Sequence, residues 1–146
     1  MSHKKIMVIG GGPAGLEAAR GIIDLGYELV LVEQRGELGG TPISASYAAL
    51  TPDMEDTETA MARMIDAVMN DSLADIRLGS SITSAEGAAP DLRVTLEKGG
   101  DSEVVEVGAV IVATGFKHFD PGKETQRYGY YEYDDVITLV DAEKML

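Results

Sequence analysis

The chain has 146 residues, of which 45% are hydrophobic, so it can bury one core but is too short for two complete nucleotide-binding domains. Its 25 acidic residues against 12 lysines and arginines give a formal net charge of -13, which disfavours nucleic acid and anionic membranes as partners. Cysteine is absent, which excludes disulfides, thiolate-held iron–sulfur clusters and a CxxC redox motif from these residues.

Neither a signal peptide nor a membrane span is predicted near the N-terminus. A strand-like run begins by Ile6, and no apolar stretch before or around it reaches the length of about 20 residues that a membrane helix needs. We therefore expect a cytoplasmic protein.

The first third of the sequence predicts a βαβ unit. Lys4–Ile9 ends in an unbroken apolar run that stops at three glycines, which is typical of a parallel strand covered on both faces. Small and apolar residues then recur on one face of a helix predicted over Pro13–Leu25, and Gly26 stands at the position of a left-handed C-cap. A second strand is predicted at Glu28–Glu33.

A second helix is predicted after a polar, glycine-bearing connection over Arg35–Thr51. Pro52 and the acidic residues that follow it are typical of a first helical turn, and the pattern continues to about Asn70. Apolar residues at helical spacing predict a buried stripe on this helix. The stripe consists of Met54, Met61, Met64, Ile65 and Val68.

Four short strand candidates follow, at Ile76–Leu78, Ile82–Glu86, Leu92–Glu97 and Val104–Val107. A Lys-Gly-Gly-Asp turn joins the last two, so we expect a small antiparallel meander over about residues 76–107, inserted in the parallel sheet. The apolar run Ala109–Ala113 then predicts one more parallel strand.

A glycine motif lies between the first strand and the first helix. Gly10 permits a tight turn, Gly12 lets the backbone approach a pyrophosphate, and Gly15 lets helix and strand pack closely. The helix N-terminus offers free N–H groups to an anion. Glu33 ends the second strand, where an acid accepts hydrogen bonds from ribose hydroxyls. The motif therefore predicts a dinucleotide site, which NAD(P) and FAD domains share.

Two further segments favour FAD over NAD(P) by resemblance. Glu33-Gln34-Arg35 followed by Gly39-Gly40 resembles the pattern of flavoproteins with two dinucleotide-binding domains, whose acid and Gly-Gly turn enclose the adenosine and pyrophosphate of FAD. Ala113-Thr114-Gly115 resembles the strand-end motif that closes their first FAD segment. The resemblance also implies an adenine contact from the meander backbone, for which Ile82 is the candidate.

These observations predict an α/β, Rossmann-like, doubly wound parallel sheet with an inserted antiparallel meander, forming an incomplete FAD/NAD(P)-binding domain. We expect an FAD-binding segment over residues 1–115, and a C-terminal extension over 116–146 with a tyrosine-rich loop and a short helix at Asp141–Leu146. The predicted cofactor-binding residues are Gly10, Gly12, Pro13, Ala14, Gly15, Glu33, Gln34, Arg35, Gly39, Gly40, Thr41, Ile82, Ala113, Thr114 and Gly115.

A more specific resemblance lies near the C-terminus. Its segments are Ala113-Thr114-Gly115-Phe116, Phe119-Asp120-Pro121, Tyr128-Gly129-Tyr130 and Asp135-Val136-Ile137-Thr138. In this order they resemble the heterodisulfide reductase A-type family, which implies an FAD-binding electron-transfer module whose partners are proteins of a redox complex or a second FAD-domain segment. Family members normally continue into that second segment. If the 146 residues are the whole polypeptide, we expect tighter binding of the ADP half of FAD than of the flavin ring.

Two other functions stay open: an NAD(P)-binding domain, and a non-catalytic assembly module that keeps the nucleotide-binding fold. No catalytic residue is predicted, and no metal site, since His3 and His118 lack neighbours at metal-ligand spacing. For two groups of loop residues, a role at the flavin or at a partner stays open beside an ordinary structural role. They are Ser44, Ser46 and Tyr47, and Tyr128, Tyr130, Tyr131 and Tyr133.

Overall fold

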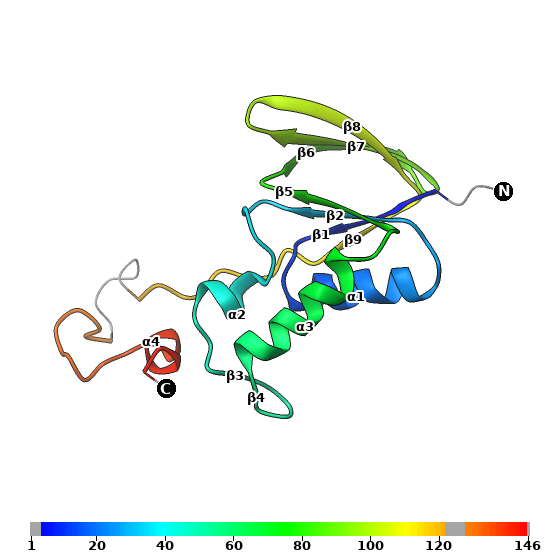
Figure 1. The fold of residues 1–146 in the computed structure, drawn as a ribbon. Helices are drawn as coiled ribbons and strands as arrows, with labels where there is room; N and C mark the ends of the chain where they lie inside the picture. Colours follow the sequence, from blue (N-terminus) through cyan, green and yellow to red (C-terminus); the bar gives the residue numbers. More distant parts are fainter. Residues whose placement is uncertain (1–3, 122–127, 146) are drawn as a thin grey trace.

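A four-stranded parallel sheet forms the centre of the computed structural model, which describes residues 4–121 and 128–145 (Figure 1). The strands are β1 (Ile6–Ile9), β2 (Leu29–Glu33), β5 (Ala74–Leu78) and β9 (Ala109–Val112), in the order β5-β2-β1-β9. Every neighbouring pair is parallel. His3 and Leu146 lie outside the described residues, whereas every predicted cofactor-binding residue lies within them.

Each face of this sheet is covered by a different layer. Helices α1 (Pro13–Asp24) and α3 (Thr57–Met69) lie on one side, and the antiparallel strands β6 (Ser81–Ala88), β7 (Asp91–Lys98) and β8 (Asp101–Val107) lie on the other (Figure 1). The apolar runs of β1 and β2 are unbroken because alternate side chains enter two different cores. The predicted doubly wound α/β fold with an antiparallel insertion is confirmed.

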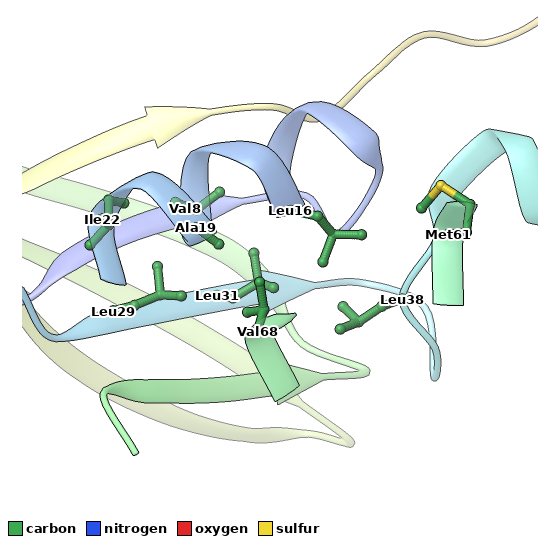
Figure 2. Close-up of a cluster of buried hydrophobic side chains, with 9 residues drawn as sticks. All are labelled: Val8, Leu16, Ala19, Ile22, Leu29, Leu31, Leu38, Met61 and Val68. Carbon is green, nitrogen blue, oxygen red and sulfur yellow. The ribbon is translucent and has the colours of Figure 1, made fainter. Parts of the chain in front are cut away.

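The core on the helix side is the larger of the two (Figure 2). Val8, Leu29 and Leu31 extend from the sheet toward the helices. The small Ala19 lets α1 pack closely on the strands, and Val68 of α3 completes the layer. On the opposite face of the sheet, the second cluster joins strand residues to the meander. Its buried members are Met7, Val30, Val32, Val94, Leu96 and Val107.

The second long helix begins five residues later than Pro52. Asp56 is its N-cap, and its carboxylate accepts a hydrogen bond from the Thr59 amide at 2.8 Å, so α3 starts at Thr57. Met54 lies in the short connection between β3 (Ala49–Leu50) and β4 (Glu55–Asp56), where it is 69% exposed with a φ of 53°. Met54 is therefore outside the buried stripe, and this part of the prediction was wrong. The helix begins after Asp56 because the Asp56 side chain accepts a hydrogen bond from a first-turn amide, which the Pro52 side chain cannot do.

The predicted meander also begins too early. Ile76–Leu78 belongs to β5, which pairs in parallel with β2, so the antiparallel sheet starts at Ser81. The register aligns Leu31 with Ile76 on the helix side of the sheet, where β5 extends the core. A three-residue segment with apolar residues on either side of Arg77 does not distinguish a parallel edge strand from a meander strand, which is why the sequence pattern failed here.

The C-terminal helix α4 spans Leu139–Glu143, two residues ahead of its predicted start. Thr138 and Asp141 form a capping box, in which the Thr138 hydroxyl accepts from the Asp141 amide and the Asp141 carboxylate accepts from the Thr138 amide. Asp141 is therefore inside the first turn and not its start. Within the described residues, no helix is both long and apolar enough to cross a membrane.

Leu31 and Leu25 provide a matched test of this core. Leu31 is fully buried between the sheet and the helices, whereas Leu25 is 75% exposed at the end of α1. Leu31→Ala is expected to lower the free energy of unfolding by about 2–5 kcal/mol because it leaves a cavity. Leu25→Ala is expected to stay within about 0.5 kcal/mol of the parent in urea denaturation. Equal effects of the two variants would contradict the described packing.

Candidate functional site

A groove of about 610 Å³ lies at the carboxyl ends of β1 and β9. The chain leaves β1 toward β2 on one side, while β9 pairs with β1 on the other, so this is the switch point at which open parallel sheets bind ligands. The groove is lined by Gly10, Gly12, Pro13, Ala14, Glu33, Gln34, Arg35, Gly40, Thr41, Pro42, Tyr47, Ala113, Thr114, Gly115, Phe116 and Lys117.

The structure brings most of the predicted cofactor-binding residues together in this groove. Gly15, Gly39 and Ile82 are the predicted residues that do not line it. Gly15 and Gly39 pack directly behind the lining, whereas Ile82 lies in β6 and packs against the meander-side core. The lining also includes Pro42, Phe116 and Lys117, which are not among the predicted cofactor-binding residues, and Tyr47, whose role stayed open. Pro42, Phe116 and Lys117 follow predicted segments within two residues, so extending each motif by two residues would have found them.

Two of the loop glycines are required by the protein itself. Gly10 has a φ of 107°, and a Cβ atom there would lie 2.2 Å from the carbonyl oxygen of Ala113 at the end of β9. A Cβ atom on Gly15 would lie 1.8 Å from the carbonyl oxygen of Gly10. The glycines therefore allow α1, β1 and β9 to meet closely.

Gly12 differs from these two glycines. It has an extended backbone conformation, with φ -82° and ψ -175°, which any residue can adopt. The nearest atom to a Cβ placed there is the Cα of Gly40, at 3.6 Å, an ordinary van der Waals distance. The protein therefore has room for a side chain at Gly12, and that room opens into the groove.

The N-terminus of α1 faces the same space. Gly12 is the N-cap and has no side chain to accept from the first-turn amides, and Pro13 occupies the first turn without an N–H group. No acidic residue lies in this turn. The positive end of the helix dipole and the amides that follow Pro13 are thus available to an anion in the groove.

Glu33 lines the groove and connects two of the segments that form it. Its side chain is only 7% exposed, and its two carboxylate oxygens accept hydrogen bonds from the Gly11 amide at 2.7 Å and the Arg35 amide at 2.8 Å. One carboxylate therefore joins the glycine loop to the turn after β2. Each oxygen keeps a further lone pair, so the group retains capacity for ligand hydroxyls.

The Gly39-Gly40 turn packs against the glycine loop. The Gly39 amide donates to the Gly11 carbonyl at 2.8 Å, and a Cβ atom on Gly40 would lie 2.6 Å from the Cα of Gly12. Arg35 donates from Nη1 to the Ser44 hydroxyl at 2.8 Å, which orients its guanidinium beside the short helix α2 (Gly40–Ser44). This turn is thereby fixed relative to the loop.

Two aromatic side chains, Tyr47 and Phe116, line the groove next to His118, at what we call its aromatic end. Tyr47 and His118 are 3.1 Å apart between the phenol oxygen and Nε2, and the His118 ring also meets Phe116 edge-on with centroids 5.1 Å apart. The Glu143 carboxylate of α4 accepts from the Ala48 amide at 3.1 Å, so the C-terminal extension contacts this end of the groove. The position of His118 is thus set by its contacts with two aromatic rings.

No group of acidic and histidine side chains suited to hold a metal ion occurs in the described part of the chain. The charged residues along the groove itself are Glu33, Arg35 and Lys117. The lining therefore carries two cations and one carboxylate, in a protein whose net charge is -13. Together with the uncapped N-terminus of α1, this excess of positive charge suits an anionic ligand.

The chain belongs to the pyridine nucleotide-disulphide oxidoreductase family, whose model matches residues 4–145. Dihydrolipoamide dehydrogenase of Chaetomium thermophilum is 28% identical over 142 residues, which cover 96% of this chain and 25% of that protein. An A-type iron-sulfur protein of CoB–CoM heterodisulfide reductase from Methanopyrus kandleri is 22% identical, over 99% of this chain and 33% of that protein. The chain thus spans a third or less of these relatives.

Solved structures show the same fold. L-proline dehydrogenase from P. horikoshii aligns with a TM-score of 0.67 and 23% identity, over 77% of this chain and 22% of that one. The flavin-dependent monooxygenase PieE, in complex with FAD and substrate, aligns with a TM-score of 0.61 and 15% identity, over 77% of this chain and 30% of that one. The solved structures therefore agree with the family match in showing a dinucleotide-binding fold of the pyridine nucleotide-disulphide oxidoreductase type.

The contrast between Gly15 and Gly12 can be measured as stability. Gly15→Ala is expected to lower the free energy of unfolding by about 1–3 kcal/mol or more, because its Cβ would collide with a backbone carbonyl. Gly12→Ala is expected to cost less than about 1 kcal/mol, the loss of a favourable N-cap residue. Thermal unfolding followed by circular dichroism would show the difference, and a cost at Gly12 as large as at Gly15 would mean that Gly12 is a packing residue.

Proposed function

We propose that this chain binds FAD and serves as the flavin-binding module of an oxidoreductase. The observation that carries the proposal is the uncapped N-terminus of α1, which opens into the groove beside a glycine that the protein's own packing does not require. A phosphate group placed against Gly12 would explain both features, since it needs the backbone N–H groups and the space that a side chain would fill.

The pyrophosphate is proposed to lie along the glycine loop. Ala14 and Gly15 follow Pro13 in the first turn of α1, and their amides are directed to the N-terminal end of the helix. Across the groove, Gly40 and Thr41 form the facing wall. Ala113-Thr114-Gly115 passes beneath the loop at the end of β9, where close contact with Gly10 brings the two strand ends together.

The adenosine half is proposed to lie at the Glu33 end. The carboxylate already accepts two backbone amides, and its remaining lone pairs are available to the two ribose hydroxyls. Gln34 and Arg35 continue the groove at this end. A backbone contact between Ile82 and adenine stays a prediction, because Ile82 lies in β6 outside the lining.

FAD is favoured over NAD(P) by the resemblance of Glu33–Gly40 and Ala113–Gly115 to flavoprotein segments, and the second half of the groove is compatible with a flavin ring. The Gly39-Gly40 turn closes against the glycine loop, and the groove continues past it to Tyr47, Phe116 and Lys117. This end offers aromatic surfaces to a flat ring system, for which stacked or edge-on contacts are favourable. The cofactor, when bound, supplies the hydride or electron transfer. The chain's own residues bind and orient it, and no residue is proposed to be catalytic.

We further infer a role in an electron-transfer complex of the heterodisulfide-reductase-A type. Support comes from the motifs between Ala113 and Thr138, and from the similarity to the Methanopyrus kandleri protein over nearly the whole chain. In this proposal residues 1–115 are the FAD-binding segment, 116–146 are an extension, and partner proteins of the complex or a second FAD-domain segment complete the flavin site. A cytoplasmic location is part of the same proposal.

Gly12→Val tests the proposed function directly. The valine side chain would occupy the space proposed for the pyrophosphate, so we expect the affinities for FAD and for ADP to fall at least about 100-fold in calorimetry, while the circular dichroism spectrum stays native. Gly21→Val is the control, because a Cβ on this α1 glycine meets no atom within 4 Å. Unchanged FAD affinity in Gly12→Val would remove the loop from the site.

The unmutated protein tests the two alternative functions. Binding of NADH but not of FAD would support the NAD(P)-binding domain, and binding of neither cofactor would support an assembly module.

Glu33→Ala tests the adenosine end. Loss of hydrogen bonds to a buried carboxylate is expected to lower FAD affinity by about 1.5–3 kcal/mol, and it also lowers stability because the Gly11 and Arg35 amides lose their acceptor. Glu28→Ala, at the exposed residue just before β2, is the matched control. Calorimetry and urea unfolding separate the two effects. Reduced stability with unchanged FAD affinity would show that Glu33 only fastens the loop.

A further inference from the structure

A second concave site lies in the C-terminal extension, and its lining shares no residue with the dinucleotide groove. It is a cavity of about 340 Å³, lined by Tyr130, Tyr131, Tyr133, Asp134 and Asp141 together with two aliphatic residues. We call it the tyrosine–aspartate cavity. Three aromatic rings and two carboxylates around one small space form an unusual composition, because aromatic residues make up only 5% of this chain.

A tight turn fixes the position of Tyr133 in the cavity wall. The Tyr133 amide donates to the Gly129 carbonyl at 3.0 Å, and the Val136 amide donates to the Tyr133 carbonyl at 3.1 Å. Gly129 has a φ of 69°, and a Cβ atom there would lie 2.7 Å from Cδ2 of the Tyr133 ring. The glycine therefore lets the ring pack across the turn.

Asp141 orients a second ring. Its Oδ2 accepts hydrogen bonds from the Tyr130 hydroxyl at 2.6 Å and from the Thr138 hydroxyl at 2.7 Å. These bonds lower the pKa of Asp141 to about 2, so the carboxylate is negative at neutral pH. The Tyr130 ring in turn meets Tyr131 edge-on, with centroids 4.8 Å apart and an interplanar angle of 74°. The cavity wall is thus ordered before any ligand arrives.

The exposed surface around the cavity is both acidic and apolar. Tyr131 and Tyr133 are 70% and 64% exposed, and Ile137 and Leu139 beside them are also exposed. The charged residues of the described segment 128–145 are Glu132, Asp134, Asp135, Asp141, Glu143 and Lys144. The segment is therefore strongly negative. Tyrosine faces and carboxylates both attract cations, and an exposed apolar rim favours a macromolecular ligand.

The cavity is also close to the aromatic end of the dinucleotide groove. An adjoining apolar cavity of about 490 Å³ shares Tyr130, Val136 and Ile137 with it and is also lined by His118. His118 contacts Tyr47, which lines the groove. A ligand at the tyrosine–aspartate cavity would therefore lie on the side of the molecule where the groove ends in Tyr47 and Phe116.

We propose that the tyrosine–aspartate cavity is the docking site for a basic segment of a protein partner. A lysine or arginine side chain of the partner enters the cavity between the Tyr131 and Tyr133 rings and the carboxylates, and its apolar neighbours cover Ile137 and Leu139. The negative charge of the segment 128–145 favours a basic partner over an acidic one. Only the idea that this partner exchanges electrons with the flavin rests on the proposed function; the docking site itself does not.

The test uses the 146-residue chain, labelled with ¹⁵N, and the peptide acetyl-Leu-Arg-Leu-Lys-Leu-amide as a probe. We expect the peptide to shift the amide signals of residues 130–134 and to bind more weakly as salt is raised. The same peptide with glutamine in place of arginine and lysine is expected to leave those signals unchanged. Because the cavity does not need FAD, binding is expected in its absence, so a failed FAD proposal leaves this result intact.

Variants identify the site. Tyr131→Ala and Tyr133→Ala are each expected to weaken peptide binding about two- to fivefold, whereas Tyr131→Phe, which keeps the ring face, retains it. Asp134→Asn is expected to weaken binding and flatten its salt dependence. Glu97→Gln, which removes an equal charge from the exposed meander, is expected to change nothing.

Three results would overturn the proposal. Equal losses in Asp134→Asn and Glu97→Gln would show attraction to the net charge alone. Full binding by Tyr131→Ala would remove the rings from the site. Sedimentation of the free chain as a dimer that becomes monomeric on Tyr131→Ala would show that a second copy, and not a basic partner, occupies this surface.

Discussion

The site depends on one buried carboxylate. Glu33 ends β2 and accepts hydrogen bonds from the Gly11 amide and the Arg35 amide, so it ties together the two chain segments that leave the parallel sheet. The Gly39 amide then reaches the Gly11 carbonyl, which places the Gly-Gly turn on the same loop. A buried charge of this kind is costly unless it is hydrogen-bonded, and the two backbone amides meet that need. The loop geometry, and with it the free N-terminus of α1, follows from that requirement.

The two-sided sheet explains where function can lie. Helices cover one face and the meander covers the other, so β1 and β2 have no free face, and a ligand has access at the strand ends (Figure 1). There the groove carries Arg35 and Lys117 in a strongly acidic protein, while the segment 128–145 is acidic and aromatic. This contrast in charge fits the two proposals, an anionic cofactor in the groove and a basic partner at the tyrosine–aspartate cavity.

Much of the fold and of the groove could be predicted from the sequence because their signals are local. Unbroken apolar runs indicated β1, β2 and β9, and the spacing of Gly10, Gly12 and Gly15 indicated the loop. The errors arose where tertiary contacts decide: Met54 lies outside α3 because Asp56 caps that helix, and β5 joins the parallel sheet because its register extends the helix-side core. The contact between Tyr47 and His118, 71 residues apart, has no local signal at all.

The central claim, that the groove holds the pyrophosphate of FAD against α1, is tested most directly by the amide spectrum of the ¹⁵N-labelled chain during a titration with FAD. We predict that the largest shifts belong to Gly12, Ala14 and Gly15, followed by Arg35, because their N–H groups lie at the phosphate and ribose positions. FAD binding that leaves these four signals unmoved, or that shifts the meander or the C-terminal extension instead, would contradict it.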